Sequence, residues 1–298
     1  MEPDDARFVD VDWAGRTVRV EYAWIAPERR ERPLVVFLHE GLGSLAMWKD
    51  FPRTLCEAAG LRGLVFSRPG YGRSTPRAAG ERWDVDYLHR QAHEVLPAFF
   101  HAVGLDPAAP PPWLLGHSDG GSIALLYAAR NPRRVAGLVL LAPHIFVEPL
   151  SVTSIEAVRQ AYLTTDLRER LARYHDDVDS TFWGWNEIWL HPPFRAWNIE
   201  DELSRIECPV LAVQGHDDEH GTLEQVRGIR RRVPGATLVE LPECRHSPHK
   251  DQPARLVEEV ARFIEDSGAR RPLVVPGATN QSPGHAGRTP RSTKGGTP

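Results

Sequence analysis

The sequence predicts an α/β fold: a mostly parallel central sheet flanked by helices, with an inserted helical segment. Three observations support this fold class. Short, continuous apolar runs alternate with helical periodicity along most of the chain. A Gly-x-Ser-x-Gly sequence stands between one such run and a helix. One long interval between two apolar runs contains only helical patterns. Alternating strands and helices favour βαβ units and a three-layer arrangement.

The first elements differ from the rest because their side chains alternate between apolar and polar. Residues 8–11 and 17–24 show this alternation, and Ala14-Gly15 lies between them. Such a pattern predicts an antiparallel hairpin with one face exposed to water.

After Pro33 the predicted strands become continuously apolar, as expected for strands buried on both faces of a parallel sheet. The predicted strands are residues 34–38, 63–66, 113–115, 135–141, 210–213 and 237–241. The predicted helices between them are residues 47–59, 84–103, 120–130, 222–233 and 252–266.

The chain from Pro143 to Pro209 breaks this rhythm, because it is much longer than a simple connection needs to be. We interpret residues 146–202 as a helical cap inserted over the C-terminal edge of the sheet. The predicted core then comprises residues 1–145 and 203–267. Residues 268–298 lack Asp and Glu and are rich in Pro, Gly, Ser and Thr, so we predict a disordered tail.

The Gly-x-Ser-x-Gly sequence reads Gly116-His117-Ser118-Asp119-Gly120. Between a strand and a helix it predicts a nucleophile elbow, a turn so sharp that only glycine fits two residues before and two residues after the serine. This geometry presents the Ser118 hydroxyl at the edge of the sheet. Serine becomes a good nucleophile only when a base takes its proton and an acid orients that base.

Two later loops carry suitable partners. The strand at 210–213 is followed by residues 214–220, which include Asp217 and Asp218, and the strand at 237–241 is followed by residues 242–248, which include His246. The order Ser, Asp, His along the chain is that of the α/β-hydrolase fold.

With these motifs, residues 8–266 resemble the α/β-hydrolase superfamily. Gly215 to Asp218 matches the family's Gly-x-x-Asp, and residues 245–248 match its Gly-His-x-Pro except that Arg245 replaces glycine. The resemblance implies that Asp218 is the acid and His246 the base. Asp217 is the alternative acid and His249 the alternative base.

The resemblance also implies an oxyanion hole made by the backbone N–H groups of Gly41 and Asp119. Two positions depart from the family pattern. Glu40 stands where glycine is usual, and we expect its side chain to turn away and bond locally. Ser67 stands where the family's Asp-x-x-Gly-x-Gly-x-Ser loop has aspartate. We interpret this loop as scaffold.

The inserted segment contains four tryptophans between residues 183 and 197. An apolar or aromatic substrate pocket could be lined by one or two of them, the alternative being that they form the segment's own core. The pocket candidates are Trp183, Trp185, Trp189 and Trp197, of which the first three are preferred. Arg195, His144 and Asn186 are candidates for orienting the substrate.

Composition limits the other possibilities. The net charge of −4 argues against a nucleic-acid or acidic-membrane partner, and neither a signal peptide nor a transmembrane run is evident. Three separated cysteines favour a reduced compartment, so we expect a cytoplasmic protein. The predicted chemistry needs no cofactor and no metal. A metal site is the alternative for the cluster His216, Asp217, Asp218 and His220.

Three functions are compatible with these residues. The favoured one is a serine hydrolase that cleaves an ester-type bond of a small, fairly apolar substrate through an acyl-enzyme. The second is a hydrolase of carbon–carbon bonds in vinylogous diketones, which uses the same triad. The third is a ligand-binding receptor with weak turnover. The partner is a small-molecule substrate in each case, and the oligomeric state, a homo-oligomer included, is left open.

Overall fold

The computed structural model describes residues 6–269, and within them the strands form one eight-stranded sheet. The strand order is β1-β2-β4-β3-β5-β6-β7-β8. The strand bounds are β1 Arg7–Trp13, β2 Arg16–Ile25, β3 Leu34–Leu38, β4 Arg62–Phe66, β5 Trp113–His117, β6 Gly137–Leu141, β7 Val210–Gly215 and β8 Thr237–Leu241. From β4 to β8 in this order, all neighbouring strands are parallel. The predicted mostly parallel sheet is therefore confirmed.

The N-terminal hairpin is also confirmed. Strands β1 and β2 pair antiparallel, and Ala14 and Gly15 form the turn with φ angles of 52° and 75°. Two successive positive φ angles are typical of the tight turn whose twist matches that of a hairpin. Strand β2 then joins β4 in antiparallel pairing, which attaches the hairpin to the main sheet.

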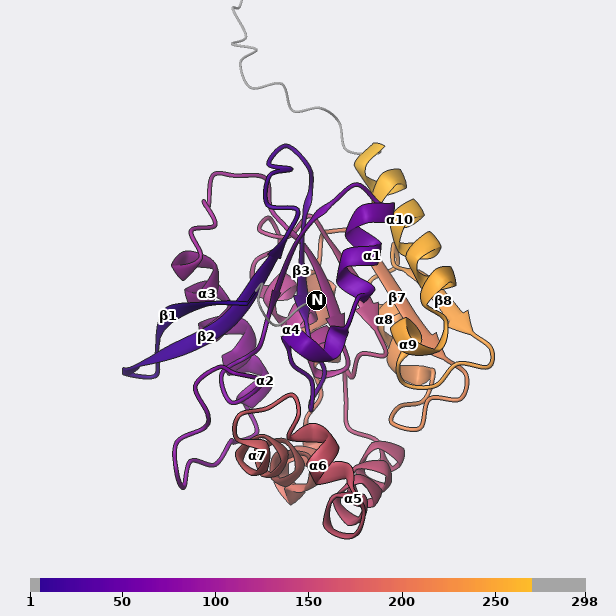
Figure 1. Ribbon diagram of the computed structural model, residues 1–298. Helices are drawn as coiled ribbons and strands as arrows, with labels where there is room; N and C mark the ends of the chain where they lie inside the picture. The colour runs from indigo at the N-terminus through magenta and orange to yellow at the C-terminus, as the bar shows by residue number, and fades with distance from the viewer. Residues whose placement is uncertain (1–5, 270–298) are drawn as a thin grey trace, which may run out of the picture.

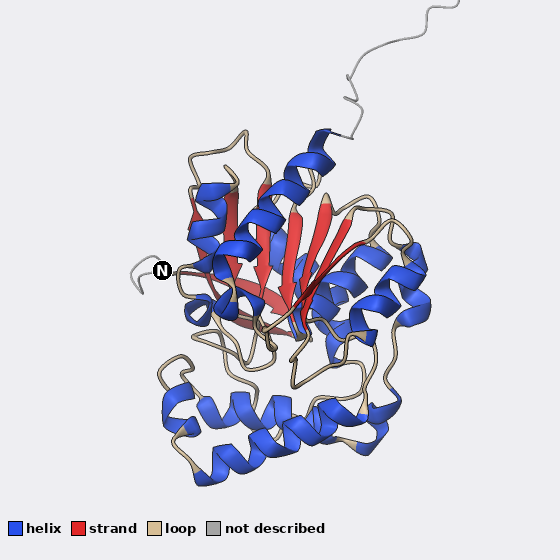
Figure 2. Ribbon diagram, turned by 90° about the vertical axis from the view of Figure 1, so that its right-hand side faces the viewer, coloured by secondary structure: helices blue, strands red, loops and turns tan. Residues whose placement is uncertain are grey.

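Helices cover both faces of the sheet (Figure 1, Figure 2). On one face, α1 (Phe51–Ala58) and α10 (Pro253–Ala269) contribute Leu55 and Val260 to one apolar core. The helices α3 (Leu96–Ala102), α4 (Asp119–Arg130) and α8 (Glu224–Arg232) pack into a second core, on the other face. Burial on both faces explains why β3, β5, β6 and β7 are continuously apolar.

Two predicted helices are interrupted. The helix predicted at 47–59 is a 3₁₀ turn, η2 (Leu45–Trp48), followed by α1, because Lys49 has a φ of 53° and Pro52 starts a new helix. The helix predicted at 84–103 consists of α2 (Tyr87–Arg90), the π-helical turn η3 (Gln91–Val95) and α3. Pro97 lacks the N–H that an α-helix would bond to residue 93, which accounts for the altered register before it.

Between β6 and β7 the chain forms a layer of helices at the C-terminal edge of the sheet, separate from the flanking helices (Figure 2). We call this layer the helical insertion. Its members are α5 Pro149–Thr164, α6 Leu167–Leu171, α7 Val178–Leu190, η4 Pro192–Ala196 and η5 Glu200–Arg205. The last turn, η5, runs past the predicted boundary at residue 202 and packs against α4 and α8 of the core.

Helix α10 continues to Ala269, so the first residues of the predicted tail at 268–298 are helical. Residues 270–298 lie outside the described part of the chain. Among the helices at 6–269, none has both the length and the apolar character needed to cross a bilayer.

Candidate active site

Ser118 occupies a sharp turn between β5 and α4. Its backbone angles are φ 52° and ψ −118°, a conformation that non-glycine residues rarely adopt. The turn is anchored because the Ser118 N–H donates to Leu141 O of β6 at 2.9 Å, while Ser118 O accepts from Gly121 N at 2.8 Å. The Ser118 residue is 7% exposed. The strand, turn and helix predicted around Ser118 are all present.

The two flanking glycines leave no room for a side chain. A Cβ on Gly116 would lie 2.2 Å from Gly120 O, and a Cβ on Gly120 would lie 2.0 Å from Leu38 O. Both neighbours are backbone atoms, which cannot move aside as a flexible side chain can. The turn therefore requires glycine at both positions.

We expect Gly120→Ala to lower the free energy of unfolding by about 3 kcal/mol or more, because the new methyl group collides with the backbone of β3. Gly235→Ala is the matched control, since a Cβ there meets nothing within 4 Å, and it should cost no more than about 0.5 kcal/mol. Urea unfolding of both variants measures the difference. Equal losses would show that the close approach at Gly120 is not rigid.

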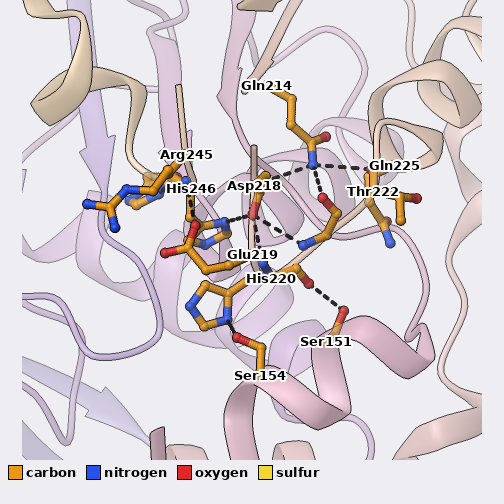
Figure 3. Close-up of polar contacts among 12 residues, drawn as sticks. Ser151, Ser154, Gln214, Asp218, Glu219, His220, Thr222, Gln225, Arg245 and His246 are labelled. Carbon is orange, nitrogen blue, oxygen red and sulfur yellow. Dashed lines mark hydrogen bonds and ion pairs between the residues drawn. The ribbon is translucent and has the colours of Figure 1, made fainter. Parts of the chain in front are cut away.

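Asp218 and His246 are brought together from the loops after β7 and β8 (Figure 3). His246 Nδ1 donates to Asp218 Oδ1 at 2.8 Å. The backbone N–H of His220 also donates to Asp218 Oδ1, at 2.8 Å, and Gln214 Nε2 donates to Oδ2 at 3.0 Å. Burial alone would raise the pKa of Asp218, but the hydrogen bond and charge of His246 outweigh it and lower that pKa to about 2.

The two alternatives lie elsewhere. Asp217 is exposed, and its backbone N–H donates to Cys244 O at 3.0 Å. His249 is buried against Trp48, with ring centroids 5.0 Å apart, and burial holds its pKa well below the usual range. Within the described residues, no group of three or more His, Cys, Asp or Glu side chains is arranged to hold a metal ion.

His117 connects the elbow to the loop of His246. Its Nε2 donates to His246 O at 2.8 Å, and its Nδ1 lies 3.5 Å from Glu40 Oε2. Glu40 Oε1 also lies 3.6 Å from Lys250 Nζ. Burial would raise the pKa of Glu40, but His117 and Lys250 hold it well below the usual range. Glu40 therefore bonds locally as expected, while the connecting role of His117 and the contact of Lys250 were not predicted.

Ser67, the second departure from the family pattern, is hydrogen-bonded to a carboxylate from another part of the chain. Its hydroxyl donates to Glu21 Oε2 at 2.7 Å and accepts from Leu45 N at 2.9 Å. Glu21 is buried on β2 and accepts from Arg73 N at 3.1 Å as well. The carboxylate that the family places in this loop thus comes from a strand of the hairpin.

The residues predicted to form the oxyanion hole lie beside the elbow. Gly41 follows β3, and Asp119 begins α4 directly after Ser118. The Asp119 side chain is fully buried and accepts from Tyr87 Oη at 2.9 Å and Trp189 Nε1 at 3.2 Å. Burial raises the pKa of Asp119, although the nearby Arg68 opposes this.

The pocket candidates divide into two groups. Trp185 lies directly against Gly41, and Trp189 reaches Asp119 and packs edge-on to His144 with ring centroids 5.0 Å apart. Trp183 instead packs within the helical insertion, against Tyr162 and Phe182. Trp197 likewise stacks on Phe194 of the insertion.

The candidates for orienting the substrate also differ in position. The His144 ring lies 5.8 Å from the His246 ring, and burial lowers the pKa of His144 to about 3. Asn186 donates to Ile155 O at 3.3 Å and so joins α7 to α5, whereas Arg195 is exposed on η4. Only His144 is close to the Asp218–His246 pair.

His220 joins the acid loop to the helical insertion (Figure 3). Its ring lies 4.6 Å from that of His246, and its Nδ1 is 2.9 Å from Ser154 Oγ of α5. Ser151 Oγ of the same helix donates to His220 O at 2.6 Å. The loop that carries Asp218 is therefore fixed against α5.

The candidate active site cannot be identified by the size of a cavity. A cleft of about 570 Å³ lies at the opposite end of the sheet, near Leu34, Arg62 and Pro112 at the beginnings of β3, β4 and β5. The elbow lies at the C-terminal end of β5, where ligands bind in open α/β sheets. We therefore identify the site from its side-chain geometry.

Known proteins match most of this chain. The family model described as "Alpha/beta hydrolase family" matches residues 35–259. The 2-hydroxy-6-oxo-6-phenylhexa-2,4-dienoate hydrolase of Burkholderia cepacia is 24% identical over 239 residues, which are 71% of this chain and 80% of that protein. The pimeloyl-(acyl-carrier protein) methyl ester esterase of Aeromonas salmonicida is 25% identical over 266 residues, which are 78% of this chain and 95% of that protein.

Solved structures show the same fold. The thermophilic esterase of Thermogutta terrifontis, with malate bound, has a TM-score of 0.65 and 18% sequence identity and covers 88% of this chain and 98% of its own. The enol-lactonase of Burkholderia xenovorans has a TM-score of 0.64 and 20% identity, covering 83% and 97%. At these identities the likeness concerns the fold alone.

Proposed function

Because the chain belongs to the alpha/beta hydrolase family, we propose that it is a serine hydrolase that cleaves an ester-type bond of a small, fairly apolar substrate. The observation that carries this proposal is the hydrogen bond of 2.8 Å between His246 Nδ1 and Asp218 Oδ1. The loop of His246 is joined to the elbow that holds Ser118 at φ 52°, because His117 donates to His246 O at 2.8 Å. An Nδ1–H held by a carboxylate leaves Nε2 free of its proton, which is the tautomer that a general base needs.

In the proposed reaction, Ser118 Oγ attacks the substrate carbonyl carbon while His246 Nε2 takes the hydroxyl proton. The backbone N–H groups of Gly41 and Asp119 stabilise the negative oxygen of the tetrahedral intermediate. His246 then gives the proton to the departing alcohol, and the carbon–oxygen bond to the alcohol breaks. A water molecule, deprotonated by His246, releases the acid from Ser118 in the second half of the reaction.

The preference for an apolar substrate rests on the side chains around the elbow. Trp185 and Trp189 come from α7. His144 is buried beside Trp189, and burial lowers its pKa to about 3, so it is neutral at pH 7. Among the sequence relatives, the Aeromonas salmonicida protein is named as a methyl ester esterase. These observations favour an uncharged acyl group next to Ser118.

A rapid-mixing experiment with p-nitrophenyl acetate tests the proposal. We expect a burst of about one equivalent of p-nitrophenolate per active site, followed by slower turnover as the acyl-enzyme hydrolyses. The Ser118→Ala variant should show neither phase. A protein that binds the ester and releases no p-nitrophenolate would instead be a receptor.

Carbon–carbon bond hydrolysis is the second candidate, because the Burkholderia cepacia relative is named as the hydrolase of a 2-hydroxy-6-oxo-dienoate and the same triad would serve. The discriminating substrate is 2-hydroxy-6-oxo-6-phenylhexa-2,4-dienoate, whose cleavage is followed as loss of dienoate absorbance. The proposal expects kcat/KM for p-nitrophenyl acetate to exceed that for the dienoate. The reverse order would assign the chain to carbon–carbon bond cleavage.

A further inference from the structure

One helix of the insertion touches both residues proposed to form the oxyanion hole. From α7, Trp189 Nε1 donates to Asp119 Oδ1 at 3.2 Å. One turn earlier, Trp185 lies so close to Gly41 that a Cβ added there would be 2.1 Å from its Nε1. A third contact of α7, from Thr181 Oγ1 to Gly70 O at 2.7 Å, fixes the start of the helix to the core.

The Asp119 carboxylate creates an electrostatic problem at this point. It belongs to the residue whose backbone N–H is proposed to face the oxyanion, and it is fully buried. A free negative charge there would oppose the negative oxygen that forms in the reaction. The charge is instead compensated by Arg68 Nη2 at 3.7 Å and by hydrogen bonds from Tyr87 and Trp189.

These contacts come from three separate parts of the chain. Arg68 follows β4, Tyr87 lies on α2, and Trp189 lies on the helical insertion. Trp189 contributes the contact on Asp119 Oδ1, whereas Tyr87 and Arg68 both approach Oδ2. Without the indole N–H, the buried Oδ1 would lose this partner, and the carboxyl group could rotate.

We propose that Trp189 is a positioning residue for the oxyanion hole. Its N–H fixes the Asp119 carboxylate, and this holds the Asp119 peptide in the orientation that presents its N–H to the oxyanion. The inference rests on the proposed function and extends it. It makes α7 part of the machinery that sets the rate on every substrate, in addition to any contact that the insertion makes with the substrate.

The test is Trp189→Phe, which removes the N–H and keeps an aromatic ring against His144 and Phe194. We expect kcat to fall about 10-fold with KM changed less than about twofold, and by the same factor for acetate, butyrate and benzoate esters of p-nitrophenol. Affinity for a trifluoromethyl ketone, which forms a tetrahedral adduct on serine, should fall by the same factor.

Trp197→Phe is the matched control. Trp197 is also a buried tryptophan of the helical insertion, and within the described residues its Nε1 has no hydrogen-bond partner. Its kcat, KM and inhibitor affinity should match those of the parent enzyme. Asp119→Ala provides the second arm because it removes the acceptor: adding Trp189→Phe to it should cost nothing further.

Two results would overturn the inference. One is a kcat of Trp189→Phe within about twofold of the parent; the other is a loss confined to KM or to one acyl group, which would make Trp189 a pocket wall. Should Trp189→Phe fold poorly, Trp189→Leu, which also lacks the N–H, is judged by the same change in kcat. Absence of an acyl-enzyme in the parent protein would instead contradict the proposed function itself.

Discussion

Replacing Ser118 by alanine is expected to lower kcat for p-nitrophenyl acetate by about 10⁵- to 10⁶-fold. The variant lacks the oxygen that forms the acyl-enzyme, so only the oxyanion hole and binding would remain to assist attack by water. Folding should be almost unaffected, since the interactions that anchor the turn are made by the backbone N–H and C=O of Ser118. Steady-state kinetics and thermal melting of the same preparation measure both effects.

Ser122→Ala is the control for this experiment. Ser122 is buried like Ser118 and lies on α4, directly after the elbow, but its hydroxyl donates to His144 O at 2.6 Å and has no role in the proposed chemistry. Its kcat should stay within about 10-fold of the parent value, with a loss of stability of about 1 kcal/mol for the missing hydrogen bond. If Ser118→Ala retained comparable activity, Ser118 would not be the nucleophile.

The second large effect is expected from Asp218→Asn, which should lower kcat by about 10⁴-fold. An amide in place of the carboxylate would favour a proton on Nε2 of His246, and that tautomer cannot accept the proton of Ser118. Asp217→Asn is the matched control: the same chemical change on an exposed neighbour should leave kcat within about twofold. Similar losses in the two variants would mean that neither aspartate is the specific partner of His246.

The lowered pKa of Asp218 gives this prediction a pH dependence. With a pKa of about 2 in the folded protein, the carboxylate is charged throughout pH 5–9, so the difference between parent and Asp218→Asn should persist over this range. In the unfolded chain the pKa of this group is about 3.9. Asp218 therefore contributes stability above about pH 4, and this contribution is lost as the pH falls towards 2. Urea unfolding between pH 2 and 6 should show a smaller acid sensitivity in the Asn variant.

Local patterns in the sequence predicted the features that depend on neighbouring residues. The continuous apolar runs identified the parallel strands, because burial on both faces leaves no polar alternation. Gly-x-Ser-x-Gly located the turn at Ser118 for a local steric reason, the close approach of Gly120 to the backbone of β3. The resemblance of Gly215 to Asp218 to the family's Gly-x-x-Asp motif selected the aspartate that the structure places against His246.

Features that depend on distant segments could not be predicted in this way. Glu21 and Ser67 are 46 residues apart, and Trp189 and Asp119 are 70 residues apart, so nothing in the local sequence links them. The same holds for His117, which occupies a variable position of the motif and meets the loop of His246 only after folding. The break at Lys49 arises because its backbone adopts a positive φ, which helical periodicity does not reveal.

The central claim is that Ser118 forms a covalent intermediate with the aid of His246. Its most direct test is to treat the protein with diethyl p-nitrophenyl phosphate and to locate the adduct by peptide mass spectrometry. The account predicts about one diethylphosphoryl group per chain, on the peptide containing Ser118, and much slower labelling of the His246→Ala variant. A label on another residue, or full hydrolytic activity after complete labelling of Ser118, would contradict it.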